Sequence, residues 1–488
     1  MVMALSVRRS LGWMTLSQGS LFVLQFGTTL VIARLLTPYE MGVFAVAVAV
    51  VGLLSLLRTL GLSSYLVRAA KLDEAMLATT FTINAAIAAL ISILIVGLSA
   101  VGEAALNEPG VQRLLLVMAL LPLIGIFEFL PAAGIEREGN FRIISWISII
   151  RSIVSNAIIL CFAFAGFSYM SLAYGQIASS LVGLIAINVV GRRHVRLRLG
   201  FFNWREIMKF GLHMLAISGV SALTSRLAEL LMGHLLGLSA LGIYSRASGL
   251  NGMLWENVHI VVARVVFVDF SEQRRKGIAL RASYLRIVQV VTALLWPAFA
   301  GMAVIAGPLV MTLYGSAWID AALPLSLLSI SAIVLVSITM TWEIFVVCEE
   351  TGRQARFEFM RASAGLVMFA AGCWLSLTAA AVARVGEAIF AVMLYRPHLE
   401  RMTGTQPKDF TPIYVQSAAL TLLAIAPAIV TMTLFSWSPE VPIGAVACSV
   451  FLGVVAWLAG LFALRHPVSD EIRTLVSRIL PGRTTVQT

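Results

Sequence analysis

Long apolar runs separated by short polar segments are the dominant pattern along the chain. A helix that crosses a lipid bilayer needs about 20 predominantly apolar residues, because each residue adds only about 1.5 Å of length. The runs that meet this requirement predict fourteen transmembrane helices, at 11–33, 40–60, 76–100, 111–132, 143–165, 168–190, 210–236, 241–264, 284–306, 322–346, 357–377, 379–396, 413–435 and 442–464. The predicted fold is therefore an all-α integral membrane protein.

The apolar segments contain an internal repeat. Residues 29–54 align without a gap on residues 229–254, an offset of 200, and the sequence around Glu128 has a counterpart around Glu343. Six helices, an even number, separate equivalent positions, so the two halves are expected to have the same orientation in the membrane. This pattern predicts two pseudo-symmetric six-helix lobes followed by two C-terminal helices, with boundaries at 1–200, 201–400 and 401–488.

Composition agrees with a membrane location and excludes most other classes. Hydrophobic residues make up 59% of the 488 residues, charged residues only 12%, and the mean hydropathy is +0.93. A soluble domain carries about 25% charged residues, so soluble enzymes and disordered proteins are excluded. The four cysteines show no paired spacing and lie in or beside apolar stretches. They predict neither a zinc site nor a disulfide framework, and we interpret them as small buried apolar residues.

The formal charge of +11 is distributed as in a membrane protein and not as in a nucleic-acid-binding protein. With the N-terminus inside, 28 of the 35 basic residues lie on the cytoplasmic side, whereas the opposite loops hold Arg34, Arg113 and Arg384. Cytoplasmic loops are expected to carry this excess, so both termini are predicted to be cytoplasmic. The first span is predicted to be uncleaved, and the apolar periodicity from Ile472 to Leu480 predicts an amphipathic tail helix on the inner leaflet.

Several motifs identify a family. The pattern RLLTPYEMGVF at 34–44, followed by LGLSSYLVR at 60–68, resembles the opening of bacterial polysaccharide flippases of the Wzx type, within the multidrug/oligosaccharidyl-lipid/polysaccharide (MOP) superfamily. The second half is similar through LLGLSALGIYSRA at 235–247, VVFVDFS at 265–271 and LYGSAWI at 313–319. The resemblance covers residues 5–400.

This resemblance implies an activity, a substrate and a location. A protein of this type carries an undecaprenyl-diphosphate-linked oligosaccharide across the bacterial inner membrane by alternating access, for the synthesis of O-antigen, capsule or exopolysaccharide. The expected partners are this lipid-linked oligosaccharide, the membrane lipids and other polysaccharide assembly proteins. No cofactor is expected, and the coupling ion, a proton or sodium, is left open.

Arginines inside the predicted spans are candidates for binding the diphosphate and sugar headgroup. A charge near the bilayer centre costs on the order of 3 kcal/mol and usually faces a bundle interior or a watery cavity. Arg151, Arg226 and Arg246 occupy such positions. A guanidinium offers a rigid two-pronged donor to phosphate, so these residues predict a cationic cavity. Structural ion pairs and arginines that extend to the membrane interface are the alternatives.

Acidic residues and one histidine are candidates for energy coupling or gating. Glu256 and His259 are three residues apart and share a helix face, where a protonatable coupling pair and a satisfied interior pair are both open interpretations. Glu128 and Glu343 occupy matching places near the ends of the fourth and tenth spans, where an inner gate and helix capping are both open interpretations. The same spacing argument predicts local ion pairs between Arg226 and Glu229 and within the Arg384–Glu387 segment.

Other functions fit the sequence less well. The loops between predicted spans do not exceed about 20 residues and contain no GxxxxGK[ST] motif, so an enzyme with an extramembrane catalytic domain is excluded. A cation-coupled multidrug antiporter on the same fold is the alternative. It favours an acidic cavity, whereas the strongest charge in the middle of a span is Arg151. A receptor or scaffold would not require buried arginines.

Overall fold

The computed structural model describes residues 19, 21, 23–58, 60–68, 72–106, 108–195, 198–464 and 466–469. Throughout these residues the regular structure is helical, without a strand. The prediction of an all-α membrane protein is confirmed. The chain divides into two compact units, residues 1–242 and 243–488, and each is described by itself below.

The first unit contains an apolar helix at Val23–Leu35. Its further elements are α2 (Pro38–Ser55), the 3₁₀ turn η1 (Leu56–Arg58), α3 (Leu62–Arg68), α4 (Glu74–Leu106), α5 (Pro109–Met118), α6 (Leu120–Arg137), α7 (Phe141–Phe164), α8 (Met170–Val190), η2 (Arg192–His194), α9 (Trp204–Leu235) and the start of α10 (Leu238–Arg275).

Up to Ala463, the described part of the second unit contains the remainder of α10 and eight further helices. They are α11 (Arg281–Val304), α12 (Ala306–Tyr314), α13 (Ala322–Val336), α14 (Thr341–Val347), α15 (Thr351–Leu375), α16 (Leu377–Thr403), α17 (Pro407–Leu434) and α18 (Ile443–Ala463). The 3₁₀ turn η3 (Ser316–Ala321) joins α12 to α13.

Within the described ranges, ten stretches are long and apolar enough to cross a membrane. Three more of the predicted spans correspond to α9, α10 and α15, which are long helices with more polar side chains. Two of the ten stretches consist of consecutive helices, α5 with α6 and α13 with α14. The first predicted span and the predicted tail helix lie partly or wholly outside the described residues.

Local signals in the sequence explain several helix ends. Thr37 and Glu40 form a capping box at the start of α2, where the Thr37 backbone N–H donates to the Glu40 carboxylate at 2.7 Å and Pro38 occupies the first turn. The hydroxyl of Ser376 accepts the backbone N–H of Ala379 at the start of α16. That helix ends at Gly404, whose φ of 73° suits a residue without a Cβ.

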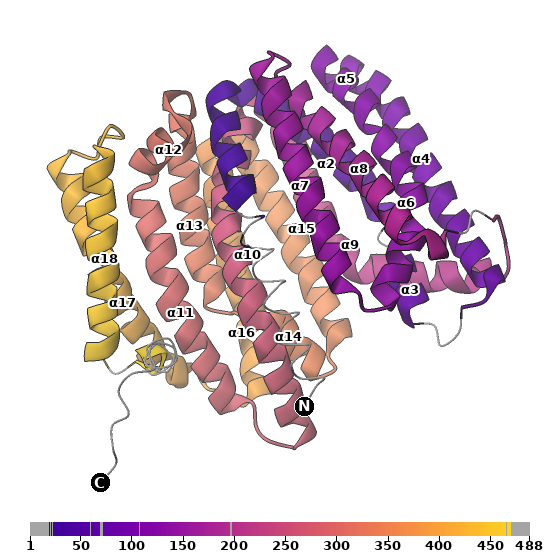
Figure 1. Cartoon of the computed structure of the whole chain (residues 1–488). Helices are drawn as coiled ribbons and strands as arrows, with labels where there is room; N and C mark the ends of the chain where they lie inside the picture. Colours follow the sequence, from indigo (N-terminus) through magenta and orange to yellow (C-terminus); the bar gives the residue numbers. More distant parts are fainter. Residues whose placement is uncertain are drawn as a thin grey trace, which may run out of the picture. The chain divides into compact units, whose positions relative to one another are not determined.

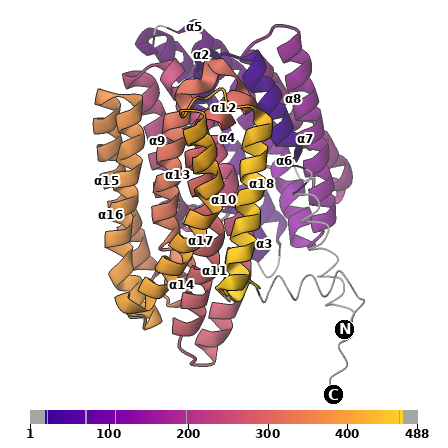
Figure 2. The ribbon, with the colours of Figure 1, turned by 90° about the vertical axis from the view of Figure 1, so that its left-hand side faces the viewer.

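Closely packed helix pairs organise each unit. In the first unit α7 packs along α8, and α6 packs against both α4 and α8 (Figure 1). In the second, α15 packs along α16, and α11, α17 and α18 lie side by side (Figure 2). Large apolar side chains such as Trp374 and Val189 remain exposed on these helices, as expected for surfaces that face lipid.

The internal repeat reappears as a reciprocal contact between α2 and the start of α10. A Cβ atom on Gly42 would collide with the backbone carbonyl of Leu238, and a Cβ on Gly242 would collide with that of Pro38. Both contacts join positions that exchange under the offset of 200 residues. The two glycines recur in the sequence because the backbones of these helices approach too closely for any side chain.

The interpretation of the cysteines is wrong for two of them. Cys373 is buried, but Cys161 and Cys448 are exposed on their helices. The reason is that an apolar stretch in a membrane protein has a face directed at lipid, so an apolar neighbourhood in sequence does not by itself imply burial inside the protein.

Candidate functional site: charged cavities within the two units

Each unit contains a cavity whose lining includes charged side chains from membrane-spanning helices. The first, about 380 Å³, is lined by residues of α2, η1, α6, α7 and α8. The second, about 510 Å³, is lined by residues of α10, α13, α14, α15 and α16 and by the turn between α13 and α14. Charges in such positions are uncommon in membrane proteins and mark substrate or ion sites.

The first cavity carries an excess of positive charge. Arg151 on α7 donates from Nη1 to Oε2 of Glu128 on α6 at 3.0 Å, and both side chains are largely buried. Arg58, from η1, lines the same cavity. The lining therefore has two guanidinium groups and one carboxylate, so one positive charge is left for an anionic ligand.

Two glycines make room for these guanidinium groups. A Cβ on Gly183 of α8 would collide with the side chain of Arg151, and a Cβ on Gly125 of α6 would collide with that of Arg58. Each arginine thus lies flat against the backbone of a neighbouring helix. This packing holds both guanidinium groups inside the unit.

The rest of the first cavity offers hydrogen-bonding groups. Its lining includes Gln176 and four serine hydroxyls, those of Ser55, Ser155, Ser179 and Ser180. Small hydroxyls both donate and accept hydrogen bonds, which suits a ligand with phosphate oxygens and sugar hydroxyls. The sequence analysis did not single out these residues, because serine is common in apolar spans and carries no charge signal.

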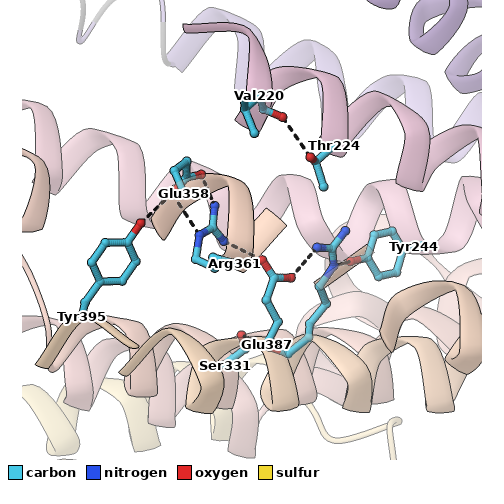
Figure 3. A network of polar contacts seen from close by, with 9 residues as sticks. Val220, Thr224, Tyr244, Ser331, Glu358, Arg361, Glu387 and Tyr395 are labelled. Atoms are coloured by element: carbon cyan, nitrogen blue, oxygen red, sulfur yellow. Dashed lines mark hydrogen bonds and ion pairs between the residues drawn. The ribbon is translucent and has the colours of Figure 1, made fainter. Parts of the chain in front are cut away.

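The second cavity is crossed by a network of ion pairs. Arg361 of α15 donates to Glu387 of α16 at 2.5 Å, and Arg384 donates to the other oxygen of Glu387 at 2.7 Å (Figure 3). Arg361 also donates twice to Glu358, whose carboxylate accepts the Tyr395 hydroxyl at 3.1 Å. The pairing of Arg384 with Glu387 confirms the local ion pair predicted from their spacing.

Arg361 and Arg384 both lie inside helices. Arg361 is about three turns inside α15, which begins at Thr351, and it falls within the predicted span 357–377. Arg384 was counted with the outer loops, but it lies inside α16, which begins at Leu377, and its guanidinium carbon is 4.2 Å from the ring centroid of Phe369. The charge of Arg384 is tolerated within the helix because Glu387, three residues later, pairs with it.

His259 pairs with a different acid from the one that its spacing favours. Its Nε2 lies 3.9 Å from Oε1 of Glu343, in the lining of the second cavity. Glu256 is exposed on α10 instead. The spacing placed Glu256 and His259 on one face correctly, but the three-dimensional arrangement brings α14 against His259. Glu128 and Glu343, the acids related by the repeat, each line the cavity of their own unit.

The other two candidate arginines do not line either cavity. Arg226 donates to Glu229 at 2.9 Å, which confirms the predicted local pair. Arg246 lies over the aromatic rings of Tyr314 and Trp318, with its guanidinium carbon 5.8 and 5.6 Å from their centroids. Of the three arginines predicted from sequence, Arg151 is therefore the one found in a charged cavity, and Arg58, Arg361 and Arg384 are cavity residues that the sequence analysis did not propose.

A signal for one of these missed residues, Arg58, exists in the repeat. Val51 and Ser55 line the first cavity, and the residues 200 positions later, Asn251 and Trp255, line the second. Extending the repeat by one turn of helix reaches Arg58 in the first unit and His259 in the second. The repeat therefore marks one cavity-facing stripe in each unit.

Comparisons with known proteins agree with this architecture. Residues 31–323 match the family described as polysaccharide biosynthesis protein. The succinoglycan biosynthesis transport protein ExoT of Rhizobium meliloti (strain 1021) is 29% identical over 68% of this chain and 67% of its own length.

Two solved structures share the fold. The lipid II flippase MurJ, in an inward closed conformation, aligns with a TM-score of 0.71 at 12% identity, over 95% of this chain and 99% of that one. An inward-facing multidrug resistance transporter of the MATE family, in the MOP superfamily, aligns with a TM-score of 0.61 at 14% identity, over 79% and 96%. At such low identity these likenesses describe the fold alone.

Proposed function

Because the chain belongs to the family of polysaccharide biosynthesis proteins, we propose that it is a flippase for a lipid-linked oligosaccharide. The family resemblance stated from the motifs is confirmed, and the protein is a multi-pass membrane protein with a MOP-type transporter fold. The proposed substrate is an undecaprenyl-diphosphate-linked oligosaccharide, which moves from the inner to the outer leaflet of the bacterial inner membrane. Alternating access carries the headgroup while the lipid tail stays in the bilayer.

The excess positive charge of the first cavity is the observation that carries this proposal. Arg58 and Arg151 provide guanidinium groups inside the spans, and Glu128 balances one of them. A diphosphate is the anionic part of the proposed substrate, and guanidinium is the side chain that matches phosphate oxygens best. The serine hydroxyls beside them suit the first sugar.

A cation-coupled multidrug antiporter remains the second candidate. The lining of the second cavity contains three carboxylates, those of Glu343, Glu358 and Glu387, against two arginines. An excess of acid suits an organic cation, and a MATE transporter shares the fold. The ion pairs of Glu358 and Glu387 with Arg361 and Arg384 neutralise most of this charge, so the flippase is favoured.

Deletion of the gene in its host distinguishes these two functions. A missing flippase is expected to abolish surface polysaccharide and to leave the lipid-linked oligosaccharide accumulated in the inner leaflet. The measurement is mass spectrometry of extracted undecaprenyl lipids together with quantification of surface polysaccharide, and a plasmid copy of the gene is the control. Unchanged polysaccharide with increased sensitivity to cationic drugs would instead establish the antiporter.

The proposed orientation places both termini in the cytoplasm and is tested by cysteine labelling. In a variant that lacks the four native cysteines, Arg193→Cys in η2 is expected to resist an impermeant thiol reagent in intact spheroplasts, because the basic loop is cytoplasmic. Glu440→Cys, in the exposed loop between α17 and α18, is the matched control and should react. The opposite labelling pattern would reverse the topology.

A further inference from the structure

The membrane-spanning stretch that contains α13 and α14 is broken in its middle. Residues 337–340 form a turn between the two helices, and Met340 has a φ of 60°, in the left-handed region. A non-glycine residue held there costs roughly 1–3 kcal/mol and is found chiefly at functional sites. Breaks at membrane depth are tolerated where they line a cavity, and Thr339, Met340 and Thr341 all line the second cavity.

A buried carboxylate follows this break directly. The Glu343 side chain is only 5% exposed, its Oε2 atom has no hydrogen-bond partner, and its Oε1 atom is 3.9 Å from His259. The neighbouring hydroxyl of Thr339 also lacks a partner. A bare carboxylate in such surroundings is unfavourable by several kcal/mol, so it requires a proton or a cationic partner.

His259 is the group that faces this carboxylate, and it is itself titratable. Its Nδ1 atom has no hydrogen-bond partner, and its ring stacks on Trp255 with centroids 5.0 Å apart and an interplanar angle of 13°. Histidine is the side chain whose ordinary titration lies between about pH 5 and 8. The pair therefore places a nitrogen that can accept a proton beside a buried carboxylate.

The other charged groups around the pair are already compensated. From α15 and α16, Glu358 and Glu387 face the cavity with Arg361 and Arg384 as their partners, while Tyr395 and Tyr244 form hydrogen bonds within that network. At the break itself, the Ser337 carbonyl accepts hydrogen bonds from Tyr414 and Arg396, and Arg396 pairs with Glu400. On α10, Glu256 is exposed. Among the side chains that the structure describes, Glu343 is thus the cavity acid whose ionic partner is titratable.

The repeat gives the same contrast between the two units. In the first, the cavity acid Glu128 faces Arg151 and Arg58, whose charge is permanent. In the second, the equivalent acid Glu343 faces His259, at the position one residue beyond the equivalent of Arg58. The first unit thus has a permanent cation beside its cavity acid, whereas the second has a histidine, which is a cation only when protonated.

We propose that His259 and Glu343 form a proton-binding site at the break between α13 and α14. A proton resides on the imidazole, where it forms a charge pair with the carboxylate, or on the carboxyl itself. Either state neutralises Glu343, and release of the proton leaves a buried charge that favours rearrangement of the break. The proposal that this site binds a proton is independent of the flippase proposal. The further statement that proton binding drives transport rests on the flippase proposal.

Fluorescence of Trp255 reports proton binding in the purified protein without any glycan. An imidazolium quenches the fluorescence of an indole stacked on it. The fluorescence of Trp255 is obtained as the wild-type intensity minus that of Trp255→Phe, and it is expected to decrease as the pH falls through the range from about 8 to 5. His259→Asn should abolish this titration. Glu343→Gln should move its midpoint to lower pH by at least about one unit, because the carboxylate no longer favours the imidazolium.

Glu256→Gln is the matched control, since Glu256 is on the same helix three residues from His259 but is exposed. Its titration should coincide with that of the wild type. Absence of a titration in the wild type, an equal midpoint in Glu343→Gln, or a signal that follows sodium at constant pH would each overturn the proton site. The wild type and His259→Asn suffice if the Glu343 variant does not fold.

Export tests the coupling role separately. Per unit of membrane-inserted protein, Glu343→Gln is expected to lower surface polysaccharide at least about tenfold, and Glu256→Gln to leave it unchanged. A confirmed titration with unchanged export in Glu343→Gln would overturn the coupling role alone. Failure of the flippase function itself appears instead as unchanged polysaccharide in the gene deletion.

Discussion

Arg151→Ala is expected to lower polysaccharide export by at least about tenfold per unit of membrane-inserted protein. A charged hydrogen bond contributes about 1.5–3 kcal/mol, and about 1.4 kcal/mol corresponds to a factor of ten in binding. Arg151→Lys should restore export only in part, because an ammonium keeps the charge but lacks the two-pronged geometry. Arg151→Glu should be worse than alanine, since it repels the diphosphate.

The ion pair with Glu128 requires a second variant, because removal of Arg151 alone leaves that carboxylate without its arginine. The double variant Arg151→Ala, Glu128→Gln removes both charges and should restore any loss of abundance. If Arg151 binds substrate, export stays low in the double variant. Export at the wild-type level would show that the arginine serves only as a partner for Glu128.

A control for this experiment lies on the same helix. Arg142 is exposed near the start of α7, nine residues before Arg151, and it lines neither cavity. Arg142→Ala is expected to export polysaccharide at close to the wild-type level. If Arg142→Ala and Arg151→Ala lowered export equally, the cause would be the general loss of positive charge from α7. That result would contradict a specific contact between Arg151 and the substrate.

Glu387→Ala is expected to destabilise the second unit strongly. Its carboxylate is only 10% exposed and accepts from both Arg361 and Arg384, so its removal leaves two guanidinium groups without this partner. Breaking a buried ion pair by removing one partner costs about 3–5 kcal/mol. The Glu387 carboxylate packs against the backbone of Gly365, where a Cβ atom would collide with it. Because Gly365 has no side chain, an alanine at position 387 leaves the space of the carboxylate empty.

Thermal unfolding of the detergent-solubilised protein measures this effect. The melting temperature should fall in the order wild type, Glu387→Gln, Glu387→Ala, since glutamine keeps the shape and an acceptor oxygen. Glu272→Ala is the control, because Glu272 forms an exposed pair with Lys276 in the same unit, and exposed pairs contribute little. A melting temperature for Glu387→Ala equal to that of the control would show that the network does not stabilise the protein.

Much of the architecture could be predicted from the chain because the membrane imposes strong rules on it. A span must be about 20 residues long and must satisfy its own backbone hydrogen bonds, so apolar length alone locates helices such as α7, α8 and α18. The local pairs Arg226–Glu229 and Arg384–Glu387 were also predictable, because residues three apart share a helix face.

The sites could be predicted only in part. Arg151 was identified because a charge in the middle of an apolar run is rare. Arg361 was not identified as a site residue, because it lies near the end of an apolar run, where charged residues usually belong to loops. In the structure its positive charge is balanced by Glu358 on the same helix and by Glu387 on a different helix.

The sequence by itself therefore determined the membrane class, the spans, the repeat and the family, all of which follow from local composition, periodicity and motif order. Only the tertiary structure decided which charges meet. Glu256 and Glu343 were both candidates, and packing placed α14 beside His259 while Glu256 remained exposed. The physical reason is that a bilayer constrains each helix separately, whereas the partner of a buried charge is set by contacts between helices far apart in the chain.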